Sequence, residues 1–121
     1  MMRYLSSALL GSLCLLFLGA CSSYPDSAEG VAQKICQAFK EKNLEGMKIY
    51  MSAEAQLQMK KRHDFLQEFF NSPEFETMKK ASDCSKSTQT KALDHGRLKI
   101  YFGEQLKVKV KEIEGQWKMV I

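Results

Sequence analysis

The residues that could carry acid–base chemistry are few and scattered along the chain. His63 and Asp64 are neighbours on a predicted helix, and adjacent helical residues do not face each other. His95 lies in a predicted turn that Asp94 favours by itself. Glu112 is the one strand carboxylate that the alternation turns inward, at a sheet end where it reaches water. Proton transfer needs an acid or base placed against a donor, and no Ser-His-Asp, metal or phosphate-loop pattern occurs. The sequence therefore indicates neither an enzyme nor a bound metal or cofactor.

Cys21 lies in a stretch, residues 4–25, that carries no charge. Residues 1–3 include one positive side chain, residues 5–18 are mainly apolar, and residues 19–20 are small. This order is typical of an export signal. A membrane-spanning helix needs about 20 apolar residues, and serines and a glycine interrupt this shorter core, so cleavage is the preferred interpretation.

The tetrapeptide LGAC at positions 18–21 resembles the bacterial lipobox. In lipoproteins the thiol of that cysteine accepts diacylglycerol, the chain is cut before it, and the freed amine is usually acylated. The resemblance implies a signal peptide over residues 1–20, a lipidated tether over 21–26 beginning at acylated Cys21, and a domain over 27–121. An uncleaved anchor, or an ordinary signal that leaves Cys21 free, are the alternatives.

The same resemblance implies a cell-envelope protein that its acyl chains attach to the membrane. Stable attachment needs two or more such chains, which a diacylated or triacylated cysteine supplies. Ser22 follows the cysteine in place of the aspartate associated with inner-membrane retention. In a cell with two membranes, the outer membrane facing the periplasm is therefore favoured.

Besides Cys21, the exported part contains two cysteines, Cys36 and Cys84. Export places them in an oxidising space, where a disulfide is expected. The bond would close a loop of about 49 residues and stabilise the fold by about 4 kcal/mol in the chain-entropy model. Metal binding by the pair is the rival interpretation, and no histidine stands at ligand spacing to support it.

Helix-start signals recur before residue 80, so the first half of the domain is expected to be helical. Asp26, with a glutamate three residues later, predicts the first helix, which Asn43 ends. Residues 44–51 form a second, short amphipathic segment. Ser52 is placed to cap a longer helix through about residue 70, and Ser72 to cap another that has proline at its first position.

After residue 81 the apolar pattern changes to strict alternation, which predicts antiparallel strands with one buried face. Residues paired across a hairpin share a face, so turn lengths test whether the strands form one sheet. Loops at 94–96, 103–105 and 114–115 bring every apolar set together. The expected pairs are Thr90 with Ile100, Ala92 with Leu98, Leu98 with Val110, Ile100 with Val108, Phe102 with Leu106, Val110 with Met119 and Val108 with Ile121.

The sequence thus predicts an α+β fold in which N-terminal helices pack on a curved, four-stranded antiparallel meander over about residues 84–121. Continued back along the first strand, the alternation turns Cys84 inward, toward the helical layer that carries Cys36. This is a second reason to expect the disulfide.

Charge excludes one class of partner. Without Arg3 the chain keeps 17 basic and 14 acidic side chains, a net charge of 17 − 14 = +3, too mild to indicate nucleic acid. Lys107, Lys109 and Lys111 alternate on the outer face of a predicted strand. They could bind anionic glycans or lipid head groups, or form a solvated face that prevents pairing with other sheets, which is the commoner case.

Helices followed by a meander that ends in EIEGQWKMVI resemble the order of the NTF2-like (cystatin-like) superfamily. The segments VAQKICQAFKEKNLEGMKIYMSAEA and GQWKMV are similar to those of its small lipoproteins grouped as the DUF4878 family. The resemblance implies a conical pocket between sheet and helices, which some relatives use for small apolar ligands and a few for isomerase or dehydratase chemistry. The candidate lining is Tyr50, Phe65, Phe69, Phe102, Trp117 and Met119.

We therefore expect a noncatalytic envelope lipoprotein, bound to the membrane by its lipid anchor, whose domain binds a small apolar ligand or an envelope protein. An enzyme that uses the pocket is one alternative. An inert structural or assembly lipoprotein is the other, because aromatic and methionine residues at such positions more often form core than a ligand site.

Overall fold

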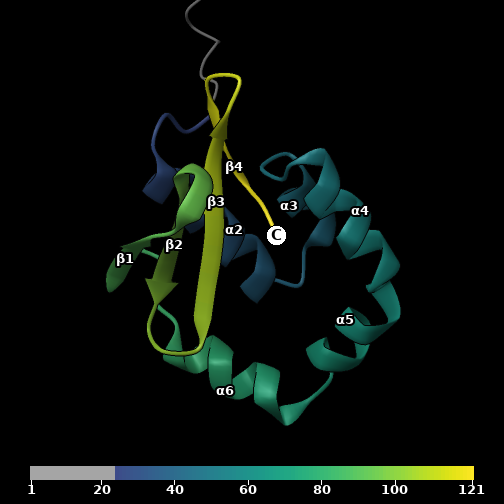
Figure 1. Ribbon diagram of the computed structural model, residues 1–121. Coiled ribbons are helices and arrows are strands. Elements are labelled where there is room, and N and C mark those ends of the chain that lie inside the picture. Colours follow the sequence, from purple (N-terminus) through teal and green to yellow (C-terminus); the bar gives the residue numbers. More distant parts are fainter. Residues whose placement is uncertain (1–23) are drawn as a thin grey trace, which may run out of the picture.

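Residues 24–121 are described by the structure, a computed structural model. The expected signal peptide, the acylation of Cys21 and the first residues of the tether lie outside these residues. Five helices precede a four-stranded antiparallel sheet, which confirms the α+β class (Figure 1). The helices are α2 (Ala28–Lys40), α3 (Leu44–Lys48), α4 (Ala53–Lys61), α5 (His63–Phe70) and α6 (Pro73–Ala81). The strands are β1 (Gln89–Ala92), β2 (Arg97–Phe102), β3 (Leu106–Ile113) and β4 (Gln116–Met119), with a 3-10 turn, η1 (Asp94–Gly96), between the first two.

Serine side chains cap three of the helices. The predictions for Ser52 and Ser72 are confirmed, since each hydroxyl accepts a hydrogen bond from a backbone N–H of the first turn of α4 or α6. The prediction of Asp26 as the first cap is wrong by one position. Ser27 has the extended backbone of a cap, and its Oγ accepts from the Gly30 N–H at 3.0 Å.

The long helix expected from Ser52 to residue 70 is instead two helices, α4 and α5, which meet at Arg62. Arg62 leaves the helical conformation, with φ −104° and ψ 20°. Residues 60–64 are all polar and exposed, so for more than a turn no apolar side chain fixes one helix axis against the core. The break turns α5 toward α6, so that α4, α5 and α6 form an arc that stands away from the sheet at α5 and returns to its lower end through α6 (Figure 1).

The sheet is a meander in the order β1-β2-β3-β4, as predicted. The expected pairs within β1, β2, β3 and β4 form, from Thr90 with Ile100 to Val110 with Met119. Two details differ. The first strand begins at Gln89 rather than near residue 84, and Ile121 does not pair with Val108 because β4 ends at Met119.

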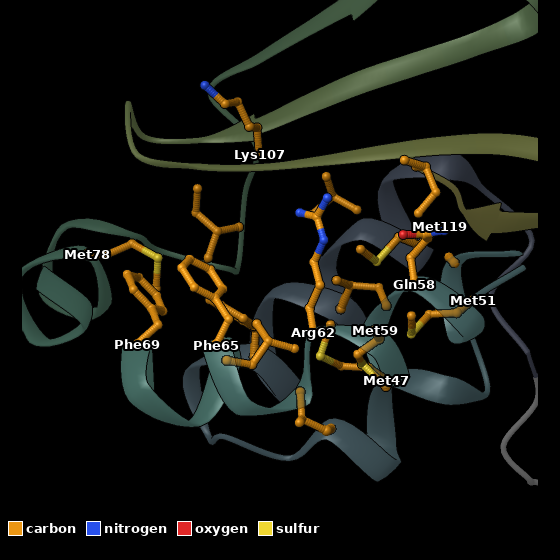
Figure 2. Close-up of a pocket in the computed structure, with 18 of the residues that line it drawn as sticks. Met47, Met51, Gln58, Met59, Arg62, Phe65, Phe69, Met78, Lys107 and Met119 are labelled. Atoms are coloured by element: carbon orange, nitrogen blue, oxygen red, sulfur yellow. The ribbon is translucent and has the colours of Figure 1, made fainter. Parts of the chain in front are cut away.

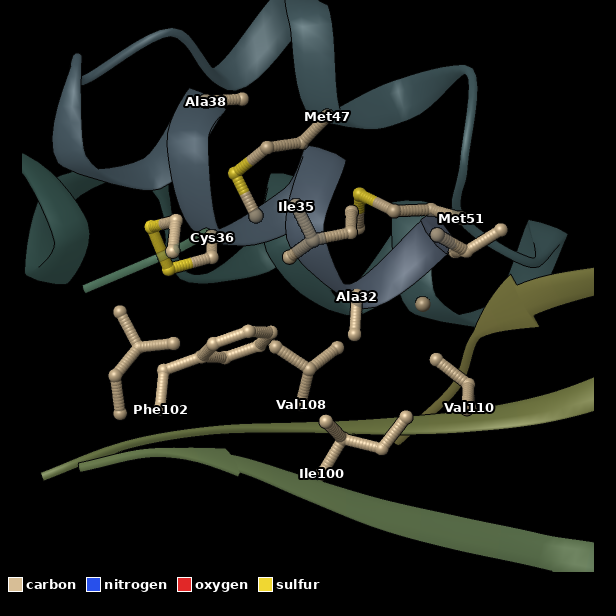
Figure 3. Close-up of a cluster of buried hydrophobic side chains, with 14 of the residues drawn as sticks. Ala32, Ile35, Cys36, Ala38, Met47, Met51, Ile100, Phe102, Val108 and Val110 are labelled. Carbon is tan, nitrogen blue, oxygen red and sulfur yellow. A yellow bond between two sulfur atoms is a disulfide. The ribbon is translucent and has the colours of Figure 1, made fainter. Parts of the chain in front are cut away.

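The core lies between α2 and the inner face of the sheet. Ala32 and Ile35 on the helix point toward Ile100, Val108 and Val110 on the strands, and all five side chains are buried (Figure 3). Complete burial of an aliphatic side chain contributes about 1.5–3 kcal/mol, so this helix–sheet layer is the main source of stability. β1 lies beyond it and is exposed along its length.

The Cys36–Cys84 disulfide is present, with the two Cα atoms 5.7 Å apart. Both cysteines are buried. The inward direction of Cys84 is as predicted, but its cause is not, because Cys84 lies in a turn before β1 rather than on a strand.

The segment 82–87 runs antiparallel to α2 and is joined to one stripe of that helix. The joined helix residues are three or four positions apart, the spacing that places side chains on one face. The links are Glu29 with Ser87, Gln33 with the Ser85 carbonyl, Cys36 with Cys84, and Lys40 with the Ser82 carbonyl. Without these links the segment would have only its own short turn to hold it.

Candidate ligand-binding groove

A groove of about 480 Å³ opens between the helical arc α4–α6 and the inner side of β3 and of the C-terminal end of the chain (Figure 2). Its volume falls within the range of about 300–1,000 Å³ that is common for small-molecule sites. Nineteen residues line it. The lining is Ile35, Phe39, Leu44, Met47, Met51, Ala55, Gln58, Met59, Arg62, Phe65, Leu66, Phe69, Met78, Gln105, Leu106, Lys107, Val108, Met119 and Ile121.

One end of the groove is fixed by a connection between α4 and the last strand. The Ser52 N–H donates to the Met119 carbonyl at 2.9 Å, and the Met119 N–H donates to the Tyr50 carbonyl at 2.7 Å. These bonds form an isolated parallel bridge between Met51 and Met119. The start of α4 is therefore attached to the sheet edge, although the rest of the helix diverges from it.

The other end is fixed by four phenylalanines. Phe39 on α2, Phe69 and Phe70 on α5, and Phe75 on α6 have ring centroids 5.2–6.2 Å apart, mostly edge to face. Such pairs contribute about 0.5–1.5 kcal/mol beyond burial. Because both ends are attached and the middle turns outward at Arg62, a space remains between them.

The chemistry of the lining is apolar with four polar exceptions. Five methionines belong to it, and methionine adapts its shape to flexible apolar ligands. The polar residues are Gln58, Arg62, Gln105 and Lys107. The lining includes no carboxylate, histidine, cysteine or hydroxyl side chain, so it offers neither a general base nor an activated nucleophile.

The two cations differ in direction. Arg62, at the α4–α5 corner, reaches from the helical side toward the strands, whereas the Lys107 side chain on β3 points away from the groove (Figure 2). Since the lining holds no negative charge, a ligand with an apolar body and an anionic end would find a matching charge at the mouth.

The residues predicted to line a pocket separate into two groups. Phe65, Phe69 and Met119 line the groove, and Phe65 is 63% exposed. Phe102 is 0% exposed and belongs to the core. Tyr50 and Trp117 are half-buried elsewhere and do not line the groove.

Tyr50 and Trp117 instead meet the N-terminal end of the described chain. The Tyr24 hydroxyl donates to the Trp117 carbonyl at 2.5 Å, and the rings of Tyr24 and Tyr50 are 5.4 Å apart. Burial, and then the neighbouring Tyr50, raise the pKa of Tyr24 above its ordinary value. The chain is thus attached to the edge strand β4 before α2 begins.

Reasoning from sequence missed Arg62 and four of the five methionines, all except Met119. Met47, Met51 and Met59 follow helical spacing, which is also the pattern of a filled core. Arg62 lies in a run of charged and polar residues, 60–64, that contains no apolar side chain to indicate a groove. A usable signal was the complete absence of apolar residues from 60 to 64, which predicts that one helix axis does not continue.

The candidate acid–base residues are exposed and do not line this groove. His63 begins α5, His95 stands in η1, and Glu112 faces solvent near the end of β3. Within residues 24–121, no three His, Cys, Asp or Glu side chains come together in a way that could hold a metal ion. None of the helices in this part of the chain is both long and apolar enough to cross a membrane.

No family model matches the chain, and neither a curated protein nor a solved structure matches it.

Proposed function

We propose that this chain is an envelope lipoprotein, anchored through acylated Cys21, whose domain binds a small apolar or amphiphilic ligand without transforming it. The observation that carries the binding function is the groove: about 480 Å³, open to solvent and lined by fifteen apolar residues out of nineteen. We also propose that the domain is NTF2-like, on the resemblance of its helical start and final hairpin and on its helix-then-meander order.

Binding is favoured over catalysis by what the lining contains. Proton transfer in a pocket needs an acid or base within hydrogen-bond reach of the substrate, and the polar groups here are two amides, a guanidinium and one amine. The amine, Lys107, is exposed, whereas a nucleophilic lysine requires a desolvated site. The groove is therefore suited to holding a ligand.

Binding is favoured over an inert structural role by the open space itself. Protein interiors are close-packed, with few voids larger than a water molecule. A domain with no ligand would gain stability if its helices closed over Met59 and Phe65, yet these side chains line an open cavity. An apolar ligand in the groove would remove that exposed apolar surface from water.

A fluorescent apolar probe with a sulfonate group, such as anilinonaphthalene sulfonate, tests the binding function. Phe65→Ser should weaken probe binding. The loss of binding free energy should not exceed about 1.5–3 kcal/mol, which is the value of completely burying one phenylalanine side chain. Ile49→Ser is the matched control: Ile49 is 61% exposed, close to the 63% of Phe65, and does not line the groove. Equal binding by both variants and the parent protein would refute the groove as the site.

Metabolic labelling tests the anchor. Labelled palmitate should be incorporated into the parent protein and be absent from Cys21→Ser. Cys84→Ser is a control that removes a different cysteine and should keep the label. Equal labelling of the parent protein and Cys21→Ser would contradict acylation at Cys21.

A further inference from the structure

The outward face of the sheet carries seven basic side chains and no acidic one. The strand register places them opposite one another across neighbouring strands. Lys91, Lys99 and Lys109 form one row, and Arg97, Lys111 and Lys118 form a second. Lys107 stands opposite Tyr101 in a third row, and the alternate residues of β2 and β3 face α2. We call these seven residues the cationic face.

Among residues 24–121, no ion pair neutralises this face. The salt bridge found within residues 24–121 joins Lys48 and Glu45, on α3. Glu112, next to Lys111 on β3, alternates onto the opposite face of the strand, and Asp94, Glu104 and Glu114 lie in the hairpin loops. Like charges directly opposite each other across strands are destabilising, so the arrangement costs the fold stability.

Protection of sheet edges does not explain the pattern. Charged residues that prevent sheet-to-sheet pairing are needed on edge strands, which here are β1 and β4. Five of the seven cations instead stand on the central strands, two on β2 and three on β3. A solvated face would also usually mix both signs of charge. The face is better explained by an anionic partner.

The face is broad. Four strands about 4.8 Å apart span about 14 Å, and successive outward residues along a strand are about 7 Å apart. The groove described above lies on the helical side of the sheet. A broad grid of cations fits a plane of phosphate groups, such as a bilayer surface, better than a small anion, which would need a concave site.

The chain reaches this face close to the proposed anchor. Tyr24 is bonded to β4, and the Lys118 ammonium lies 5.4 Å from the Tyr24 ring centroid. Three residues of extended chain span at most about 11 Å, so Cys21 cannot be farther than that from Tyr24. An acylated Cys21 would therefore hold the β4 edge of the cationic face near the lipid head groups. Because the tether is short, the effective concentration of head groups at the cationic face would be high.

We propose that the cationic face binds the anionic phospholipid head groups of the membrane that holds Cys21, so that the domain lies with its sheet on the bilayer and its helices directed away. This rests on the proposed function, because the anchor supplies the nearby membrane. Each basic residue near an anionic surface strengthens the attraction about fivefold, and salt should weaken it, because the Debye length falls from about 10 Å at 0.1 M to about 3 Å at 1 M ionic strength.

The test measures the acetylation rate of each lysine by mass spectrometry, using the lipidated protein in vesicles of phosphatidylcholine alone or mixed with phosphatidylglycerol. On the mixed vesicles, the acetylation rates of Lys99, Lys109 and Lys118 should fall to about one fifth or less of their rates on phosphatidylcholine alone. High salt should restore these rates. Lys60 and Lys79, on the helices, should react equally on both vesicles.

Two triple variants with the same change of charge provide the matched comparison. The sheet-face variant is Lys99→Gln, Lys109→Gln and Lys111→Gln. The helix-side variant is Lys60→Gln, Lys79→Gln and Lys80→Gln. Lys91 and Lys118 should lose their protection in the first variant and keep it in the second.

The failures of the two proposals are distinguishable. If the protein does not float with pure phosphatidylcholine vesicles at high salt, the anchor is wrong. If it floats with both vesicles but its sheet lysines react equally on them, the anchor stands and the membrane contact is refuted. Protection by added soluble polyphosphate, with none from phosphatidylglycerol, would overturn the membrane as partner and identify a soluble polyanion.

Discussion

Breaking the Cys36–Cys84 bond should remove a large part of the stability of the domain. The bond joins α2 to the segment 82–87, which connects the helices to the sheet. The perturbation is the double variant Cys36→Ala/Cys84→Ala, which leaves the hydrogen bonds from Gln33 and Lys40 to that segment in place.

The magnitude follows from the loop that the bond closes. The cysteines are 48 positions apart, and closing a loop of that length lowers the free energy of folding by about 4 kcal/mol in the chain-entropy model. Cys36 is 0% and Cys84 is 6% exposed, so losing two buried sulfur atoms adds a cavity cost to that value. Domains of this size have about 5–15 kcal/mol in total, so the variant should lose between about a quarter and four fifths of the stability of the domain.

Urea unfolding measures the loss, followed by the fluorescence of Trp117, the single tryptophan. The oxidised parent protein should exceed the double variant by about 4 kcal/mol or more. Reductant should lower the stability of the parent protein toward that of the variant and leave the variant unchanged. A loss below about 1 kcal/mol would refute the reasoning, because the segment 82–87 would then be held by its other links.

Three further changes test local parts of the fold. Tyr24→Phe should cost about 1 kcal/mol by removing the hydrogen bond to β4. The pKa of Tyr24 is raised in the folded state from 10.0. Its contribution to stability is therefore complete below pH 10.0 and is lost as pH rises through the higher folded pKa. In this pH range the free energy of unfolding measured with urea should fall more steeply for the parent protein than for the variant. Gly103→Ala should cost more than Gly115→Ala in thermal unfolding: both have positive φ, but a Cβ at Gly103 would meet the Ala81 carbonyl oxygen at 2.9 Å, whereas Gly115 has open space. Equal costs would mean that this contact relaxes freely. Ser52→Ala should cost about 1 kcal/mol by removing the α4 cap, and unchanged urea unfolding would contradict that role.

The sheet was predictable because its constraints are local. Alternating apolar residues and short turns fix register one hairpin at a time, and the loop at Glu114 and Gly115 has the two positive φ angles of a tight hairpin turn. The same reasoning failed before Gln89, where SKST at positions 85–88 offers no apolar alternation. Cys84 is turned inward by its disulfide and the surrounding links to α2, which strand alternation cannot express.

The groove was only partly predictable because it depends on tertiary geometry. Phe65 and Met119 could be assigned to an inner face from their spacing, but whether such a face closes on itself or leaves space depends on where α4 ends. That end, at Arg62, involves neither glycine nor proline, the usual causes of a break. The rows of the cationic face likewise follow from cross-strand register, which turns a lysine alternation along one strand into a two-dimensional array.

The most direct test of the account is the intact mass, under denaturing conditions, of the protein extracted from native membranes. The account predicts a chain that begins at Cys21 and carries the added mass of a diacylglyceryl group, with or without a further acyl chain, and with the Cys36–Cys84 bond formed. A chain that retains residues 1–20, or that begins at Cys21 without added mass, would contradict it.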